Sequence, residues 1–340
     1  MSAAAAAVAS PVLLRPGRDD DAEGFIALIG ACWAEYPGCI LDVDGEVPEL
    51  RALASYFHDQ GGMLWAAERD GRLVGMVGTR PLKEDAAWEI CRMYVDAAAR
   101  GEGLAAALLR AAEEHARAAG AERLVLWTDT RFTRAHGFYE KHGYVRQGSI
   151  RILDDISKSL EFRYAKPARG LVVEALDAAA AASAERRLTD LLVACVGAGA
   201  GLPWLHPLAP ETARPVWRKV AAEVAAGSRL LLAAWLDGVL VGSVQLDLGM
   251  PQNQPHRAGL AMLLVDPARR RHGVARALMR RAEQAAQRLG RSLLTLEARA
   301  GDAAEPLFRS LGWQEAGRIP GYVRDEAGQP RDGLFFWKQV

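Results

Sequence analysis

The sequence predicts a mixed α/β (α+β) fold in two similar domains, each a mixed, mostly antiparallel sheet flanked by helices. Three observations predict this fold. The chain has 340 residues, a length that suits two domains of ordinary size. A strand, a glycine turn and a helix occur twice at a constant spacing. Each half also contains a hairpin pattern, and neither shows the regular strand–helix alternation of a doubly wound sheet.

The two copies of the turn match residue by residue. The first runs from a β-prone segment ending at Val95 through Arg100 into an alanine- and leucine-rich helix. The second follows the same course, with Arg270 in place of Arg100. Other pairs of like residues are separated by the same number of positions as Arg100 and Arg270. They are Val95 and Val265, Gly103 and Gly273, Ala105 and Ala275, and Gly120 and Gly290. A repeat that stays in register over a whole segment indicates two homologous domains.

The first domain is expected over residues 11–164, after a disordered tail at residues 1–10. A strand at 12–15 is followed by Asp19–Asp21, which can cap a helix at 22–36. A long acidic connection then leads to a helix that ends at residue 58. The turn signal Asp70-Gly71 predicts a hairpin. The other expected elements are strands 63–68, 73–79 and 88–95, the turn helix, strand 124–127, a helix near 138–140 and strands within 148–162.

A linker is predicted at residues 165–170, because Pro167 and Gly170 interrupt regular structure. The second domain, 171–340, repeats the order of the first. Its expected elements are strand 171–176, helix 178–195, a flexible glycine-rich loop at 197–201, helix 210–226, a hairpin of strands 230–235 and 240–246, and the second turn helix.

Composition argues against several classes of protein. Lys+Arg and Asp+Glu both number 42, so a dominant basic face for nucleic acid is not expected. The four cysteines show no C-x-x-C pairing and no matched histidine spacing, which predicts no metal site and fits a reducing cytoplasm. The apolar run at 3–8 is too short to span a membrane. We expect a cytoplasmic monomer or homodimer without a nucleic-acid or membrane partner.

The glycine turn predicts an anion site. A strand that passes through glycines into a helix leaves backbone N–H groups unpaired at the helix start, and these groups favour a phosphate. Neither copy fits a dinucleotide fingerprint or a P-loop, because the G-x-G-x-x-G and G-x-x-x-x-G-K-[ST] spacings are absent. A turn that merely joins a strand to a helix would be the simpler interpretation of either copy alone.

Arg-x-x-Gly-x-Ala on a strand–turn–helix resembles the acetyl-CoA signature of the GNAT N-acetyltransferase superfamily. Each copy is followed by a second matching motif, around Tyr139 and Gly143 in the first half and around Phe308 and Gly312 in the second. The resemblance implies two GNAT domains and acetyl-CoA as the cosubstrate. The residues that it places at acetyl-CoA are Met93, Tyr94, Val95, Arg100, Gly101, Gly103, Leu104 and Ala105, and Leu263, Val265, Arg270, Arg271, Gly273, Val274 and Ala275.

The resemblance also implies an acid and a base in the first domain. Glu89, six residues before Val95, matches the family's general base, and Tyr139 matches its general acid. The alternative for Glu89 is a strand carboxylate in a salt bridge, for example with Arg92. The alternative for Tyr139 is a packed aromatic side chain. Asp129 is a second carboxylate candidate, although a cap or turn role suits it better.

The second domain departs from the pattern at both positions. Gly259 stands where the glutamate is expected, and Phe308 cannot donate a proton. The region 216–338 also resembles tabtoxin-resistance-type acetyltransferases, through Ile319-Pro-Gly-Tyr322 and the closing Leu334-Phe-Phe-Trp-Lys338 among other segments. Of that family's acidic pair, only Glu297 remains here. The first domain is therefore predicted to be catalytic, and the second is predicted to bind acetyl-CoA or to support the fold.

The predicted acceptor is a primary amine of a small molecule. Asp42 and Asp44 lie with Glu46 and Glu49 in one acidic loop, which would favour a cationic amine. Trp127 and Glu297 complete the expected acceptor contacts. A solvated acidic loop, a catalytic second domain and a non-enzymatic acyl-CoA sensor are the open alternatives.

Overall fold

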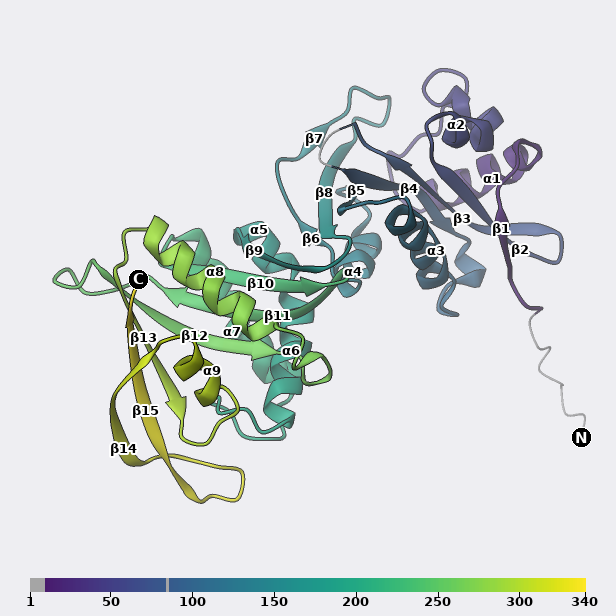
Figure 1. The fold of residues 1–340 in the computed structure, drawn as a ribbon. Coiled ribbons are helices and arrows are strands. Elements are labelled where there is room, and N and C mark those ends of the chain that lie inside the picture. Colours follow the sequence, from purple (N-terminus) through teal and green to yellow (C-terminus); the bar gives the residue numbers. More distant parts are fainter. Residues whose placement is uncertain (1–9, 84–85) are drawn as a thin grey trace, which may run out of the picture. The chain divides into compact units, whose positions relative to one another are not determined.

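The computed structural model describes residues 10–83 and 86–340, and the tail predicted at 1–10 falls almost wholly outside them. The chain forms two compact units. The first contains the chain up to His136 and residues Gly148–Arg169, and the second contains Gly137–Gln147 and Gly170–Val340. Each unit is a mixed α/β structure with a mostly antiparallel sheet (Figure 1), so the predicted fold class is confirmed.

The sheet of the first unit has the order β1-β2-β3-β4-β5-β8, with β7 paired to β8. Its neighbours are antiparallel except β4 and β5, which are parallel. The strands are β1 (Leu13–Pro16), β2 (Met63–Arg69), β3 (Arg72–Pro81), β4 (Ala87–Val95), β5 (Arg123–Asp129), β7 (Arg151–Ile152) and β8 (Leu160–Pro167). The helices are α1 (Ala22–Trp33), α2 (Leu53–Asp59), α3 (Leu104–Ala118) and α4 (Thr133–Lys141), with 3₁₀ turns η1 (Asp19–Asp21), η2 (Pro48–Ala52) and η3 (Ala97–Ala99).

Helices cover both faces of this sheet. Phe25 of α1 and Phe57 of α2 pack with Ala66 and Met76 on one face. The neighbouring residue Ala67 points to the other face, since side chains alternate along a strand. There α3 lies so close that a Cβ on Gly75 would come within 2.9 Å of Leu108. Glycine at position 75 therefore permits the close approach of α3 to the sheet.

The second unit repeats this plan with the sheet order β14-β15-β13-β12-β11-β10-β9, in which only β12 and β13 are parallel. The strands are β9 (Leu171–Leu176), β10 (Arg229–Leu236), β11 (Val239–Asp247), β12 (Arg257–Val265), β13 (Leu293–Arg299), β14 (Gln314–Arg324) and β15 (Pro330–Gln339). The helices are α5 (Ala178–Ser183), α6 (Glu185–Gly197), α7 (Pro210–Ala225), α8 (Val274–Arg288) and α9 (Glu305–Ser310), with the 3₁₀ turn η4 (Pro267–Arg269).

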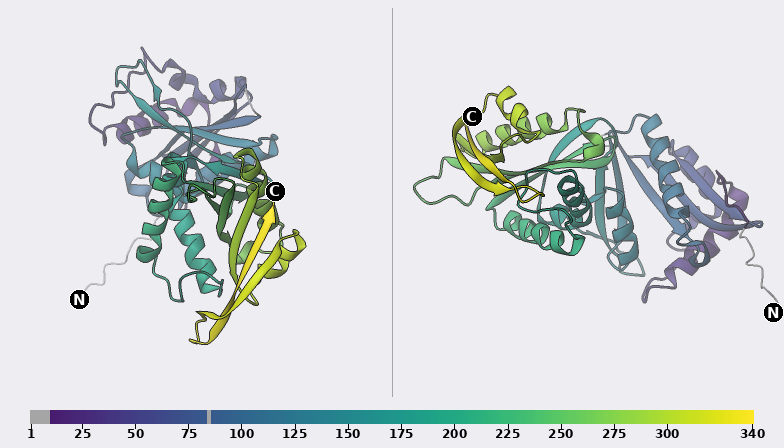
Figure 2. Two further views of the ribbon diagram at one scale, coloured as in Figure 1. Left: turned by 90° about the vertical axis from the view of Figure 1, so that its left-hand side faces the viewer. Right: turned by 90° about the horizontal axis from the view of Figure 1, so that it is seen from below.

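Two core layers hold the second unit together. Leu231 and Trp235 of β10 pack with residues of α5, α6 and α7, including Trp217. Leu232 and Ala234, which alternate with them, pack against α8 on the opposite face. Figure 2 shows the sheet between these two sets of helices.

Three elements differ from the expected ones. Residues 165–167, assigned to the linker, continue β8, because their ladder to β5 runs to the pair Arg123–Pro167 and the buried Lys166 forms an ion pair with Glu113 at 2.8 Å. The helix predicted at 178–195 is two helices, α5 and α6, which meet at Ala184. The segment Gly137–Gln147 belongs to the second unit although the repeat places it in the first half.

Packing explains the position of that segment. The side chain of Val145 lies in the same core layer as Leu176 and Trp217. The Trp235 indole N–H donates to the carbonyl of Gly143 at 3.1 Å. The backbone N–H of Arg146 donates to Ser183 Oγ at 2.8 Å. Burial and two hydrogen bonds therefore fix the segment, which includes β6 (Val145–Arg146), within the second unit.

Candidate functional site

The two glycine turns have the same local construction. Asp96 accepts a hydrogen bond from the N–H of Ala98 at 2.8 Å, and Asp266 accepts one from Ala268 at 2.9 Å. Each carboxylate caps a 3₁₀ turn that leads toward the glycines. Gly103 and Gly273 then serve as the N-caps of α3 and α8, with φ of +86° and +81°. Only glycine adopts this conformation without steric cost, so the glycines of the motif have a backbone reason.

The turns also leave room for a ligand. A Cβ placed on Gly101 or Gly103 would meet no other heavy atom within 4 Å, and one on Gly273 would only reach a leucine methyl group at 4.0 Å. The first N–H groups of α3 and α8 have no acceptor within their own helices. Both turns therefore fit the phosphates of acetyl-CoA in shape and in donor chemistry.

The charges of the two turns differ. Arg100 forms an ion pair with Glu35 at 2.5 Å, and its Nε donates to the carbonyl of Val95 at 3.1 Å. Glu35 also pairs with Arg134. The hydrogen bond from Arg100 lowers the pKa of Glu35 below its ordinary value. The first turn thus has a cation that is already partly neutralised by the protein.

The second turn carries basic side chains that have no acidic partner among the described residues. Arg269, Arg270 and Arg271 are consecutive and exposed, and none forms an ion pair with any residue that the structure describes. Arg271 stands where the first turn has Gly101 and adopts φ of +69°, which strains a residue with a side chain. The second turn therefore offers the stronger local attraction to a phosphate.

Beyond the turns, the parallel strands of each sheet separate. The ladder between β4 and β5 pairs only Ala87–Glu89 with Arg123–Val125. The ladder between β12 and β13 pairs only Arg257–Leu260 with Leu293–Leu296. Among the described residues, the rest of β4 and of β12 has no partner strand on that side. Each unit thus has a point beside its glycine turn where the two parallel strands diverge.

A β-bulge follows each point of divergence. Arg92 and Met93 lie opposite the single residue Val77, because the register shifts between Met76 and Gly78. Arg92 has φ of +50°, and Met262 at the same place in the second unit has φ of +53°. A bulge leaves an extra residue outside the ladder and redirects its side chain.

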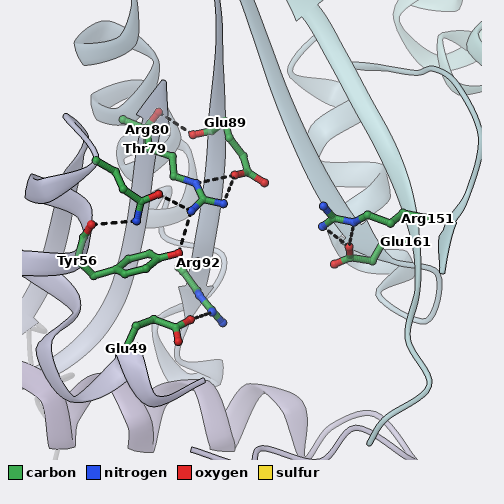
Figure 3. A network of polar contacts seen from close by, with 9 residues as sticks. Glu49, Tyr56, Thr79, Arg80, Glu89, Arg92, Arg151 and Glu161 are labelled. Atoms are coloured by element: carbon green, nitrogen blue, oxygen red, sulfur yellow. Dashed lines mark hydrogen bonds and ion pairs between the residues drawn. The ribbon is translucent and has the colours of Figure 1, made fainter. Parts of the chain in front are cut away.

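Glu89 lies on β4 at the point of divergence and is 6% exposed. Its Oε2 accepts a hydrogen bond from Nε of Arg80 at 2.8 Å and forms an ion pair with Nη2 of Arg80 at 2.7 Å (Figure 3). Its Oε1 has no hydrogen-bond partner among the described residues. The salt bridge weighed as the alternative role of Glu89 is present, but its partner is Arg80 and not Arg92. One carboxylate oxygen is therefore anchored while the other remains available.

Arg80 is itself held from three sides. Its Nη1 donates to the Tyr56 hydroxyl at 2.9 Å and to Gln60 Oε1 at 2.8 Å. Burial works against the charge of Arg80, but the attraction of Glu89 outweighs it and raises the pKa of the guanidinium. This residue was not identified from the sequence. The pairing of β3 with β4 could have indicated it, because Arg80 lies directly opposite Glu89 in this antiparallel ladder.

Arg92 extends toward the same side of the sheet. Its Nη2 donates to Glu49 Oε1 at 2.6 Å, and Figure 3 shows both side chains beside the Arg80–Glu89 pair. Tyr94, predicted to contact acetyl-CoA, is partly buried, and its hydroxyl accepts a hydrogen bond from the Trp33 indole at 3.0 Å. Burial raises the pKa of Tyr94, and the charge of Arg92 partly opposes this effect.

The residues expected at the acceptor have partners within the protein. The guanidinium of Arg151 lies 4.2 Å from the ring centre of Trp127 and pairs with Glu161. Asp42 accepts from the N–H of Gly45 at 2.9 Å, which closes a turn, and Asp44 pairs with Arg51 at 2.6 Å. Of the four carboxylates of the acidic loop, Asp44 and Glu49 are paired with arginines, while Asp42 and Glu46 accept hydrogen bonds from backbone N–H groups. The role of the loop in acceptor binding stays a prediction. No sequence signal indicated Arg151.

Tyr139 is a buried residue of α4, in the segment that belongs to the second unit. Its ring meets Tyr144 edge-on, with centroids 5.9 Å apart. Its predicted partner Glu89 belongs to the first unit, so their action as an acid–base pair stays a prediction. In the second unit Phe308 is likewise buried, against Phe336.

The site of the second unit has a different set of side chains. Gly259 lies opposite Asp247, where the first unit has Glu89 opposite Arg80. Glu297 is exposed and accepts a hydrogen bond from the Tyr322 hydroxyl at 3.2 Å, and its charge raises the pKa of Tyr322. The likeness to tabtoxin-resistance-type enzymes remains an expectation from the sequence.

In the described ranges, no three His, Cys, Asp or Glu side chains are placed to hold a metal ion together. Over the same ranges, no helix combines the length and the apolar character needed to cross a membrane.

The chain is similar in sequence to known acetyltransferases. An uncharacterized N-acetyltransferase of the hisH-hisA intergenic region of Azospirillum brasilense is 34% identical over 137 residues, 39% of this chain and 80% of that protein. The N-acetylaspartate synthetase of Rattus norvegicus is 37% identical over 94 residues, 28% of this chain and 31% of the synthetase. The chain thus spans about a third of the synthetase's length.

Solved structures are similar to about half of the chain at a time. A ribosomal-protein-alanine N-acetyltransferase from Brucella melitensis has a TM-score of 0.42 and 22% identity, covering 50% of this chain and 99% of that one. The acetyltransferase yncA from Salmonella typhimurium, solved with its cofactor acetyl-CoA, has a TM-score of 0.42 and 19% identity, covering 50% and 94%.

A family model of the acetyltransferase (GNAT) family matches residues 28–144 and 200–313, more than half of the chain and one region in each half. Both matched regions contain a glycine turn and the point where the parallel strands separate. The chain therefore belongs to the GNAT acetyltransferase family and carries its domain twice.

Proposed function

We propose that the chain is an N-acetyltransferase that moves the acetyl group of acetyl-CoA to a primary amine of a small molecule, with the first domain as the catalytic half. The observation that carries this assignment is Glu89. It is the buried carboxylate at a point of strand divergence, and it has one anchored oxygen and one available oxygen. The second domain has glycine at this position.

Each of the groups in this proposal has a defined task. Glu89 Oε1 accepts the proton that the ammonium of the acceptor loses, directly or through water. The amine nitrogen then forms a bond to the thioester carbonyl carbon, and the carbon–sulfur bond breaks. Tyr139 donates its hydroxyl proton to the departing thiolate. The nitrogen loses its second proton as the amide forms, and this proton restores the hydroxyl of Tyr139. Acetyl-CoA supplies the activated acyl group, and the N–H groups at the start of α3 orient its phosphates.

Arg80 acts as a positioning residue in this scheme. Its two contacts to Oε2 fix the orientation of the carboxylate, and Tyr56 and Gln60 fix Arg80 in turn. Positioning of this kind matters because a misplacement of about 1 Å can cost on the order of 100-fold in rate.

The second domain is proposed to bind acetyl-CoA without transferring its acetyl group. Its turn is the more basic of the two, while Gly259 and Phe308 cannot serve as base and acid. The reverse assignment would depend on Glu297, whose neighbour Tyr322 donates a hydrogen bond to it.

Thiol release from acetyl-CoA over a panel of amines tests the assignment. We expect release with at least one amine, and a loss of roughly 100-fold or more in kcat in Glu89→Gln and in Tyr139→Phe. Glu297→Gln is the matched change in the second domain and is expected to retain turnover. Activity that survives both first-domain changes but is lost in Glu297→Gln would assign the chemistry to the second domain.

A further inference from the structure

The face of β4 that carries Glu89 has charges of both signs. On one side of the sheet, Arg80 contacts Glu89, Tyr56 of α2 and the C-cap residue Gln60. On the same side, Arg92 contacts Glu49 of η2. One face of the sheet thus carries three neighbouring charges, those of Glu89 and Arg92 on β4 and that of Arg80 on the adjacent strand β3. A site for a plain cationic amine would be expected to have an excess of carboxylates, which is not seen here.

Arg92 is held by the protein through only part of its guanidinium. Nη2 donates to Glu49, whereas Nε and Nη1 have no hydrogen-bond partner among the described residues. The side chain is 22% exposed, so it is mostly covered but still reachable. An arginine presents its N–H groups in a planar fork that matches a carboxylate. Arg92 therefore has the donors to receive a second carboxylate beside that of Glu49.

The second domain shows that the fold does not need this arginine. Met262 occupies the same position of the same bulge, with nearly the same φ. Asp247 and Gly259 replace the pair Arg80–Glu89. The bulge and the strand divergence persist without these charges. A role in ligand binding therefore explains the charges of Arg80, Glu89 and Arg92 better than a role in folding does.

We infer that the acceptor of the first domain is an amino acid or a related amine that carries a carboxylate, and that Arg92 binds this carboxylate while Glu89 faces the amine. This inference rests on the proposed function. Glu89 and Arg92 are three residues apart on one strand, a span of at most about 10 Å between their Cα atoms. Both side chains can therefore reach the two ends of one small zwitterion.

The test compares acceptors that differ only in the carboxylate. Alanine, aspartate and glutamate are each assayed beside the corresponding amide of the carboxyl groups, with ethylamine as the minimal amine, and kcat/KM is measured by thiol release. We expect the wild type to prefer acids over amides by roughly 100-fold, because a site built to pair with a group discriminates against analogues that lack it.

Arg92→Met installs the residue of the second domain. It is expected to raise KM for the acids by roughly 100-fold with a much smaller change in kcat, and to leave KM for acetyl-CoA unchanged. Arg92→Lys should recover part of the preference. The double variant Glu49→Gln/Arg92→Met should show the same loss, which excludes an effect of an unpaired Glu49. Circular dichroism verifies folding of each variant.

Arg15→Met is the control. Arg15 is also a partly buried arginine of the first unit, paired with Asp21 and Glu68 at 2.8 and 2.9 Å, but it lies on β1. This variant should keep the preference for acids. Equal turnover of acids and amides, or an equal loss for all acceptors in Arg92→Met, would overturn the inference while leaving the acetyl transfer intact. Absence of release with every amine would instead contradict the proposed function.

Discussion

The chemistry open to Glu89 depends on which of its oxygens Arg80 holds. Both contacts of Arg80 go to Oε2, so the carboxylate is fixed in place and keeps one acceptor atom. The family pattern predicts Glu89 from the sequence, because the residue lies at a constant distance from the turn. Arg80 could not be predicted with equal ease. Its role depends on the register across β3 and β4, where a bulge shifts the pairing by one residue.

Glu35 makes a pH-dependent contribution to stability. The hydrogen bond from Arg100 lowers its pKa from the ordinary value of 4.5. A carboxylate with a lowered pKa in the folded state stabilises the protein above its unfolded pKa, and the contribution is lost as the pH falls below about 4.5. We therefore expect Glu35→Gln to cost about 1 kcal/mol at neutral pH, since the pair is partly screened by solvent, and much less in acid.

Urea unfolding of the wild type and Glu35→Gln, at neutral pH and in acid, measures this difference. Glu23→Gln, an exposed change on α1, the helix that precedes Glu35, is the control and should have little effect at either pH. A difference that is the same at both pH values would mean that Glu35 acts through packing and not through its charge.

At the scale of elements, the glycine turns are the part of the site that the sequence predicts best. Their conformation is set locally by glycines at positive φ and by an aspartate cap, and local rules can be applied without the rest of the fold. The bulges at Arg92 and Met262, unlike the glycine turns, cannot be predicted from local sequence. No residue type marks them in the sequence, because a bulge is a property of two paired strands.

Substitution of Arg271 measures the backbone strain in the second turn. It adopts φ of +69° at the position that Gly101 occupies in the first turn. A left-handed conformation costs a residue with a side chain about 1–2 kcal/mol. Glycine avoids this cost, but its greater freedom in the unfolded chain offsets part of the gain in stability. We expect Arg271→Gly to stabilise the ligand-free protein by about 0.5–1 kcal/mol.

Arg269→Gly is the matched variant, because it removes the same charge from the 3₁₀ turn η4, where φ is not positive. Denaturant unfolding should show it to be neutral or destabilising. If both variants shift stability in the same direction by the same amount, charge repulsion and not backbone strain explains the effect.

At the scale of the whole molecule, the chain is a tandem with unequal halves. The repeat in the sequence predicts two domains, and the structure has two units of the same plan. The sequence did not predict that Gly137–Gln147, with Tyr139, belongs to the second unit. That assignment depends on the burial of Val145 and on contacts with Ser183 and Trp235, which lie far away in the sequence.

The unequal charges of the two turns predict two unequal sites for coenzyme A. Titration calorimetry at low salt should show two molecules per chain. Binding at the second turn should weaken more with salt, because Arg269, Arg270 and Arg271 are exposed and unpaired within the described part of the chain, while Arg100 is already paired with Glu35. Gly273→Val should remove one site. A wild-type chain that binds only one molecule of coenzyme A, with binding unchanged in Gly273→Val, would contradict this division.

The central claim is that the first domain performs the acetyl transfer, and blocking one turn at a time tests it most directly. Gly103→Val and Gly273→Val each place a β-branched side chain at a left-handed helix N-cap, so both carry the same strain. Thiol release is then measured with one accepted amine. The account predicts a loss of roughly 100-fold or more in Gly103→Val and near-normal turnover in Gly273→Val. Turnover that is lost in Gly273→Val and retained in Gly103→Val would contradict it.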